Sequence, residues 1–287
     1  MISVDRSGNR VETYDGQGGA VSFLMDTATG RLLLRVLVQP WVSRLGGWLL
    51  DRAPSRLLIR PFVRRCGLDL SDWTEDRWPS YNAFFCRRIK PEKRPIDRCP
   101  DHLIAPCDGK LTVCPIGPDS VFTIKGVEYT LESLLRSPEL AERFRGGLLL
   151  LFRLTVDDYH RYCWALDGSA GQEVRIDGLF HTVNPRAAER RPIYRENTRE
   201  YCLLHTENFG PVVVMEVGAM LVGRIVNHFV PGPVRRGDEK GRFEFGGSSI
   251  ILCLPPNSTD MDPDIILNSR GGLETIVKMG EKIGKKR

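Results

Sequence analysis

Hydrophobic residues follow two different patterns along this chain. Between residues 27 and 67, apolar residues recur among arginines with helical spacing, and Pro40, Pro54 and Pro61 interrupt them. We therefore predict two or three short helices there, followed by a further helix over residues 79–90. Beyond residue 100, short apolar runs are separated by Gly and Pro turns, as in β-strands. The clearest predicted strands cover residues 148–154, 212–217, 220–226 and 249–254.

This order of elements predicts an α+β fold, in which an amphipathic helical N-terminal portion precedes a β-rich catalytic body. We assign residues 1–78 to an N-terminal arm and the amphipathic helices, and residues 79–287 to the β-rich body. Residues 1–24 are polar and rich in glycine, which predicts a short hairpin or a loose arm. With 287 residues, the chain can bury a sizeable core as one domain or two.

Positive charge is concentrated in one segment of the chain. The net charge of +5, from 41 Lys and Arg against 36 Asp and Glu, is too small to indicate nucleic-acid binding. Between residues 31 and 65, however, eight arginines accompany a single acid, Asp51. Amphipathic helices with arginine and tryptophan are typical of segments that lie in the plane of an anionic membrane surface. The alternative is a set of core helices whose arginines are solvated.

The sequence indicates neither a membrane-spanning helix nor a secretion signal. No apolar run approaches the roughly 20 residues that cross a bilayer. Asp5, Arg10, Glu12 and Asp15 interrupt any signal-peptide pattern. The eight cysteines show no Cys-x-x-Cys and no metal-ligand spacing, so we expect reduced thiols, a cytosolic compartment and no metal site.

The segment Gly246-Gly247-Ser248-Ser249 contains a peptide bond that can cut itself. Glycine leaves the carbonyl of residue 247 open, and the Ser248 hydroxyl can attack it in an N-to-O acyl shift. β-Elimination from the ester leaves dehydroalanine, which hydrolyses to a pyruvoyl group that forms Schiff bases with amines. Most Gly-Gly-Ser-Ser sequences are ordinary turns, so this interpretation depends on the other motifs of the chain.

Seven motifs occur in order, and the chain ends on an eighth related segment, Val277-Lys-Met-Gly-Glu-Lys-Ile-Gly. The seven are Tyr81-Asn-Ala-Phe-Phe-Cys-Arg-Arg, Lys93-Arg-Pro-Ile-Asp, Ala105-Pro-Cys-Asp-Gly-Lys, Asp158-Tyr-His-Arg, His181-Thr-Val-Asn-Pro, Val217-Gly-Ala-Met-Leu-Val-Gly and Gly246-Gly-Ser-Ser. From about residue 25 to its end, the chain resembles the phosphatidylserine decarboxylase family. Where that family usually has Gly-Ser-Thr, Ser249 replaces the threonine and keeps the hydroxyl.

The resemblance implies a lyase of phospholipid biosynthesis that is made as a zymogen. Autocatalytic cleavage between Gly247 and Ser248 would give chains 1–247 and 248–287, with a pyruvoyl cofactor derived from Ser248. The enzyme would decarboxylate phosphatidylserine to phosphatidylethanolamine through a Schiff base, as a peripheral protein on the cytoplasmic face of the membrane. Its partners would be phosphatidylserine and an anionic membrane surface, with a homodimer left open.

Three further residues take candidate catalytic roles from the resemblance. Asp108 would orient the self-cleavage machinery, because a carboxylate can fix the tautomer of a histidine. His160 would serve the decarboxylation cycle as a proton donor. The better-known family pattern has a second histidine three residues later, where this chain has Cys163, and a neutral thiol is a poor base. Either His160 serves both as the base of self-cleavage and as the proton donor of decarboxylation, or His181 activates Ser248.

Two other functions remain open from the sequence. One is a pyruvoyl decarboxylase of a soluble amino acid or of S-adenosylmethionine, which would not need the arginine-rich segment. The other is a membrane-bound pseudoenzyme that never cleaves, which the cysteine at position 163 favours. Arg161, Arg186 and Arg199 are candidate phosphate ligands, since guanidinium groups bind phosphate through fork-like hydrogen bonds, and the alternative is that they are only solvated.

Overall fold

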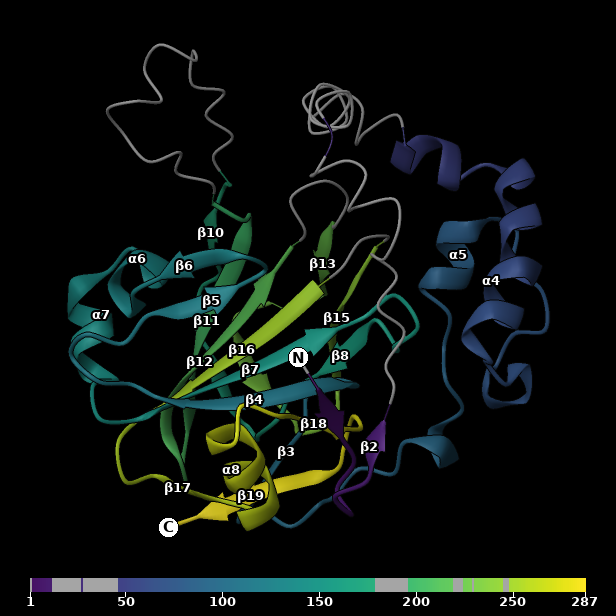
Figure 1. The fold of residues 1–287 in the computed structure, drawn as a ribbon. Coiled ribbons are helices and arrows are strands. Elements are labelled where there is room, and N and C mark those ends of the chain that lie inside the picture. The colour runs from purple at the N-terminus through teal and green to yellow at the C-terminus, as the bar shows by residue number, and fades with distance from the viewer. Residues whose placement is uncertain are drawn as a thin grey trace.

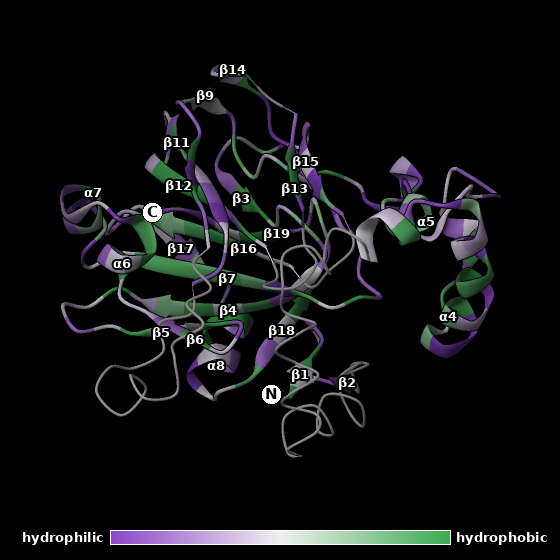
Figure 2. Ribbon diagram, turned by 90° about the horizontal axis from the view of Figure 1, so that it is seen from above, coloured by the Kyte–Doolittle hydropathy of each residue, from purple (hydrophilic) through white to green (hydrophobic). Residues whose placement is uncertain are grey.

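A largely antiparallel sheet forms the frame of the protein (Figure 1). The computed structural model describes residues 2–11, 27, 46–178, 196–218, 224–228, 230–244 and 248–287. Within these ranges, strands build the body and short helices lie at its sides, so the predicted α+β fold is confirmed. Helices α4 and α5 lie to one side of the sheet in Figures 1 and 2.

The largest described sheet runs through most of the body. In spatial order its strands are β14 (Gly232–Val234), β9 (Gly168–Ala170), β11 (Arg199–Thr206), β12 (Gly210–Val217), β16 (Ser248–Leu254), β7 (Leu148–Leu154), β4 (Gly109–Pro115), β18 (Glu274–Val277), β1 (Ser3–Val4) and β2 (Arg10–Val11), with β10 (Val174–Ile176) paired to β11. Strand β1 is parallel to β18, whereas the pairs from β11 through β18 are antiparallel. The predicted strands over 148–154, 212–217 and 249–254 are confirmed, while most of the one over 220–226 lies outside the described residues.

The smaller sheets complete the body. They are β13 (Ile225–Asn227) with β15 (Glu239–Phe243) and β8 (Arg161–Cys163), then β17 (Thr259–Met261) with β19 (Lys282–Lys286) and β3 (His102–Ile104), and the hairpin of β5 (Phe122–Ile124) and β6 (Val127–Tyr129).

The central strands are apolar on both faces because each face is covered. Every residue of β16 is buried. Ile250 and Leu252 belong to one large core cluster, whereas Ile251 and Cys253 belong to a second cluster that includes the β5–β6 hairpin. Side chains alternate between faces along a strand, so β16 lies between two cores and has no polar face. Figure 2 shows β16, β7 and β4 as a mainly hydrophobic layer.

Helices are short in the described part of the chain. Residues 46–50 are helical, and the remaining elements are η1 (Ala53–Leu58), α4 (Ile59–Cys66), η2 (Leu70–Asp72), α5 (Tyr81–Phe85), η3 (Pro91–Lys93), α6 (Leu131–Leu135), α7 (Pro138–Arg143) and α8 (Pro263–Arg270).

The predicted helix boundaries were wrong at two places. Pro61 does not interrupt a helix, because it lies in the first turn of α4, where a missing N–H breaks no intrahelical bond. The helix expected over 79–90 is only α5. Ser80 caps it by accepting a hydrogen bond from the Ala83 amide, and beyond its end Ile89 pairs with Trp73 in a β-bridge.

Helices α4 and α5 pack on each other through aromatic contacts. Phe62 of α4 meets Tyr81 and Phe84 of α5 edge-on, with ring centroids 5.8 and 5.9 Å apart. Such pairs add about 0.5–1.5 kcal/mol beyond their buried area. After α5, the buried Arg87 donates to the Asp157 carbonyl at 3.3 Å and ties this helix pair to the sheet.

Several strands of the main sheet end at one edge, which carries the candidate site. Ser248 begins β16 and is paired with Leu154, the last residue of β7. The next residue, Ser249, is paired with Val217, the last residue of β12. Gly109 begins β4 against β7, where an added Cβ would lie only 3.1 Å from the Arg153 carbonyl oxygen. The pairing of these strands therefore brings residues 108, 154, 217 and 248 together at one edge of the sheet.

Candidate active site

Ser248 is fully buried at the start of β16. Because side chains alternate along the strand, its side chain shares a face with Ile250 and the large core cluster, while Ser249 faces the second cluster. Gly247, the other half of the predicted cleavage site, lies outside the described residues.

His160 lies in the turn that leaves β7, two residues past Asp158, and is buried. Its Nδ1 is 2.9 Å from the Asp158 carbonyl oxygen, and its ring centroid is 4.0 Å from that of Phe85. A carbonyl can only accept, so Nδ1 carries the proton and Nε2 carries the lone pair. Nε2 is buried and has no hydrogen-bond partner among the described residues. The imidazole is therefore oriented with its basic nitrogen available.

Burial decides the charge of this histidine. Burial is the main cause that lowers the pKa of His160 from 6.5 to about 3; the Arg87 and Lys125 cations act in the same direction, and Asp158 opposes them. His160 is consequently neutral at physiological pH, the form in which an imidazole accepts a proton.

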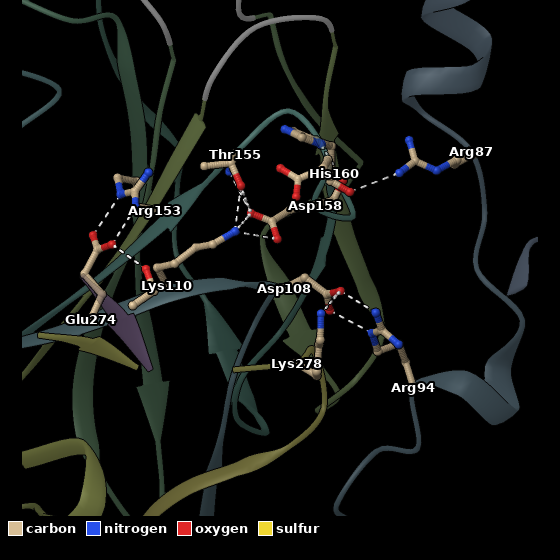
Figure 3. A network of polar contacts seen from close by, with 12 residues as sticks. Arg87, Arg94, Asp108, Lys110, Arg153, Thr155, Asp158, His160, Glu274 and Lys278 are labelled. Atoms are coloured by element: carbon tan, nitrogen blue, oxygen red, sulfur yellow. Dashed lines mark hydrogen bonds and ion pairs between the residues drawn. The ribbon is translucent and has the colours of Figure 1, made fainter. Parts of the chain in front are cut away.

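A buried ion pair shapes the same turn (Figure 3). Lys110 Nζ lies 2.7 Å from Asp158 Oδ2 and donates to the Thr155 hydroxyl at 2.6 Å. The Thr155 amide donates to the Asp158 carboxylate at 2.7 Å. Although burial opposes ionisation, Lys110 and these hydrogen bonds hold the pKa of Asp158 below its usual value. This pair fixes the backbone whose carbonyl orients His160.

Asp108 is held by cations at the same edge (Figure 3). Arg94 binds its carboxylate with two N–H groups, one of them at 2.7 Å, and Lys278 Nζ lies 3.5 Å away. The Met279 amide also donates to it at 2.9 Å. The contact expected between Asp108 and His160 is not formed, because Nδ1 of His160 already bonds the Asp158 carbonyl. His181, the alternative partner, lies outside the described residues.

Cys163 is a buried residue of β8 that belongs to the large core cluster. Burial raises the pKa of its thiol to about 12, and its amide donates to the Pro106 carbonyl at 2.8 Å. A thiol in this state carries almost no thiolate near neutral pH, so it is a poor base.

The arginines proposed as phosphate ligands have structural partners. Arg161 donates to the Cys86 carbonyl at 2.9 Å and pairs with Glu239 at 2.7 Å. Arg199 is fully buried and donates to the carbonyls of Leu134 and Ser133. Both therefore hold the fold together, and Arg186 lies outside the described residues.

Sequence reasoning missed a buried polar cluster on the face of the sheet that Ser248 shares. Lys240 Nζ is 2.7 Å from Glu216, and both side chains are almost fully buried. Asn227 bridges this pair to Glu200 and to the Tyr162 hydroxyl. The one feature of the sequence that could have indicated this cluster is Glu216, an acidic residue within an otherwise apolar strand.

Within the described ranges, no three His, Cys, Asp or Glu side chains lie so as to hold a metal ion. Among the same residues, no helix has the length and apolar character needed to cross a membrane.

Comparison with known proteins gives the family. The profile of the phosphatidylserine decarboxylase family matches residues 81–285. The chain is 42% identical over 270 residues to phosphatidylserine decarboxylase proenzyme 2 of Clostridium acetobutylicum, covering 94% of this chain and 92% of that protein. It is 43% identical over 210 residues to the phosphatidylserine decarboxylase proenzyme of Clostridium novyi, covering 72% and 71%. The corresponding proenzyme of Desulfitobacterium hafniense is 41% identical over 208 residues, covering 71% and 70%.

The edge of the sheet thus gathers a buried serine, a neutral histidine with an available nitrogen and a tightly held aspartate, all within the region that the family profile covers. This chain belongs to the phosphatidylserine decarboxylase family.

Proposed function

We propose that this chain is a carboxy-lyase that converts phosphatidylserine to phosphatidylethanolamine after cutting itself between Gly247 and Ser248. The observation that carries the proposal is the strand register. It puts Ser248 beside the end of β7, and the turn that follows β7 holds His160 with an unpartnered Nε2. The family of the chain supports the same activity.

We propose His160 as the residue that moves protons at this edge. The lone pair on its Nε2 would accept the Ser248 hydroxyl proton during self-cleavage. In the decarboxylation cycle, the protonated nitrogen would then give a proton to the substrate carbon. Its partner Asp158 O fixes the ring, and the Lys110–Asp158 ion pair fixes that carbonyl in turn. His181 remains the alternative base for cleavage.

Asp108 serves, in this proposal, as a positioning residue for self-cleavage. Its bonds to Arg94, Lys278 and the Met279 amide tie the start of β4 to the segment that follows β18. This connection holds the edge on which Ser248 lies, and it restrains motion that would misalign the hydroxyl with the preceding carbonyl.

Ser248 fits the role of cofactor precursor because it is fully buried at the start of β16 and is paired with Leu154, the last residue before the turn that holds His160. When present at residue 248, a pyruvoyl group supplies the electron sink for loss of carbon dioxide. The surrounding core excludes water from that position, which limits hydrolysis of reactive species. Cleavage would leave chains 1–247 and 248–287 associated through the pairing of β16 with β7 and β12.

We further propose that the segment around η1 and α4 rests on the cytoplasmic face of an anionic membrane. Trp48, Leu49, Leu57 and Leu58 are each at least half exposed, and Leu57 is 76% exposed. Arginines accompany them, and Arg52 lies 4.5 Å above the Trp48 ring. Exposed apolar side chains interleaved with arginine are suited to the boundary between headgroups and acyl chains.

The activity is tested with phosphatidylserine labelled with ¹³C in the serine carboxylate. The wild-type protein should release labelled carbon dioxide and form phosphatidylethanolamine, whereas Ser248→Ala should do neither, because alanine has no oxygen for the acyl shift. Ser258→Ala, a hydroxyl deletion at a turn outside this edge, is the matched control and should be active. Equal activity of wild type and Ser248→Ala would overturn the proposal.

A further inference from the structure

Glu216 is a fully buried acid of the main sheet, one residue pair away from the cleavage serine. It lies on β12 directly opposite Ile250 of β16, and Ser248 is two residues before Ile250 on the same face. Diagonal neighbours of this kind on antiparallel strands lie about 7–8 Å apart. The strand register therefore joins this carboxylate to the position at which the ketone would form.

Only one of the two carboxylate oxygens of Glu216 has a partner among the described residues. Oε2 lies 2.7 Å from Lys240 Nζ and accepts a hydrogen bond from the Asn227 side-chain amide at 3.3 Å. Oε1 is buried and accepts no hydrogen bond from any described residue. A buried acceptor in that state costs about 1–3 kcal/mol, and more when it is charged. The ion pair with Lys240 thus leaves one oxygen of a buried carboxylate available to a further donor.

The neighbouring acid of the same cluster shows the contrast. Glu200 is paired with Glu216 across β11 and β12, and it is also buried. Arg175 donates to its Oε1 at 2.7 Å, and Asn227 donates to its Oε2 at 3.0 Å. Both oxygens of Glu200 are therefore used, and the available oxygen belongs to Glu216, whose strand is the one next to β16.

The surroundings of Glu216 favour proton transfer to this oxygen. Burial raises the pKa of Glu216, while the Lys240 cation and the hydrogen bond from Asn227 oppose that shift. A carboxylate whose pKa lies above its usual value is a stronger base, and Lys240 favours the charged form without bonding to Oε1.

Cleavage would disconnect the two strands that flank Glu216. Its ion-pair partner Lys240 belongs to β15, its cross-strand partner Ile250 belongs to β16, and the uncut chain joins these strands through residues 244–247. A break after residue 247 separates the strands, so access for a small amine would arise with processing.

We propose that Glu216 is a catalytic residue that binds the amino group of the substrate through Oε1 and removes one proton from it. This inference rests on the proposed decarboxylation of phosphatidylserine. The amine arrives as an ammonium ion, which has no lone pair and therefore cannot bond to a carbonyl carbon. The ketone carbon at residue 248 is the former Cα of the serine, so a carboxylate on the same face holds the amine beside it.

The proton transfer balances without any further reagent. One proton moves from the ammonium nitrogen to Oε1, and the lone pair left on nitrogen forms the new C–N bond. The ketone oxygen then leaves as water with that proton and a second one from the nitrogen, which keeps the positive charge. Glu216 ends as the carboxylate with which it began.

Reaction of the processed protein with two small amines tests this role without relying on decarboxylation. At about pH 7, 2-methoxyethylamine is an ammonium ion that must lose a proton before it reacts, whereas methoxyamine is already neutral. Borohydride added at set times fixes the adduct of 2-methoxyethylamine, and the adduct of methoxyamine is stable. The mass of the 248–287 chain then gives the fraction that carries each amine.

The variants are Glu216→Gln, the double variant Glu216→Gln with Lys240→Met, and the control Glu200→Gln, which changes the neighbouring buried acid. Both Glu216 variants should react with 2-methoxyethylamine about a hundredfold more slowly than wild type, the lower end of what a general base contributes. All of the proteins should react with methoxyamine at the wild-type rate, and Glu200→Gln should match wild type with both amines. The double variant removes both charges, so it reports on Glu216 even where an unpaired Lys240 destabilises the single variant.

Equal rates with 2-methoxyethylamine in wild type and the double variant would overturn the inference. Equal slowing with both amines, slowing in Glu200→Gln, or failure of both Glu216 variants to process would overturn it too, because each would assign the cluster to the fold or to cleavage. Any of these results, with a wild-type protein that decarboxylates phosphatidylserine, would leave the proposed function intact. A wild-type protein that reacts with neither amine has no ketone, and that result would remove the proposed function itself.

Discussion

Burial of a neutral His160 makes the stability of the precursor depend on pH in a definite direction. The perturbation is His160→Gln, which keeps a side chain able to hydrogen-bond but removes the titration. Both proteins carry Ser248→Ala so that neither is cleaved. The folded-state pKa of about 3 lies below the ordinary value of 6.5. Between those values the unfolded chain binds a proton that the folded chain does not, so His160 costs stability as the pH falls from 6.5 toward 3.

The magnitude follows from the two pKa values. At about pH 5, an unfolded histidine is almost fully protonated while folded His160 is not, which corresponds to about 2 kcal/mol of lost stability relative to about pH 7.5. This figure barely depends on the folded-state pKa, provided that it lies below about 4. Other groups, including Asp158, contribute to both proteins and cancel when the two pH dependences are subtracted.

The assay is urea unfolding of both proteins at about pH 7.5 and about pH 5, with the free energy of unfolding obtained by linear extrapolation. The loss on acidification should be about 2 kcal/mol smaller for His160→Gln. Equal losses would refute the reasoning, because they would mean that His160 titrates normally in the folded protein and is not held neutral by burial.

Three other predictions concern cleavage and membrane binding. Cys163→Ala should process almost normally, since a thiol with a pKa of about 12 is not the base; an intact Cys163→Ala precursor alongside processed histidine variants would contradict this. Asp108→Asn should slow processing in a time course from freshly synthesised precursor, because it weakens the pairs with Arg94 and Lys278; an unchanged rate would exclude a positioning role. Replacing the four arginines of η1 and α4 with glutamine should weaken binding to anionic liposomes by about 4 kcal/mol in total, as measured by sedimentation, without blocking cleavage. Unchanged partitioning at low salt would exclude the membrane role.

Much of the β-rich body could be predicted because its central strands are continuous apolar runs. Residues 148–154 are β7 without a shift, since a strand buried on both faces leaves no polar position to blur its ends. The helices were harder to predict from the sequence. The eight-residue α8 buries little more than Ile265, so its sequence has no clear helical periodicity.

The candidate site was only partly accessible to sequence reasoning. Motifs identified Ser248, Asp108 and His160, and they also contain Arg94 and Lys278, but nothing in the sequence indicates that these two cations pair with Asp108. Pairing of this kind is set by strand register and leaves no local pattern.

An intact mass spectrum of the purified wild-type protein tests the central claim most directly. The account predicts two chains, corresponding to residues 1–247 and 248–287, with the smaller one blocked at its N-terminus by a ketone in place of an amine. Ser248→Ala, run in parallel, should give one chain near 32.4 kDa. A single uncleaved chain from active wild-type protein, or a free serine amine on the 248–287 fragment, would contradict the account.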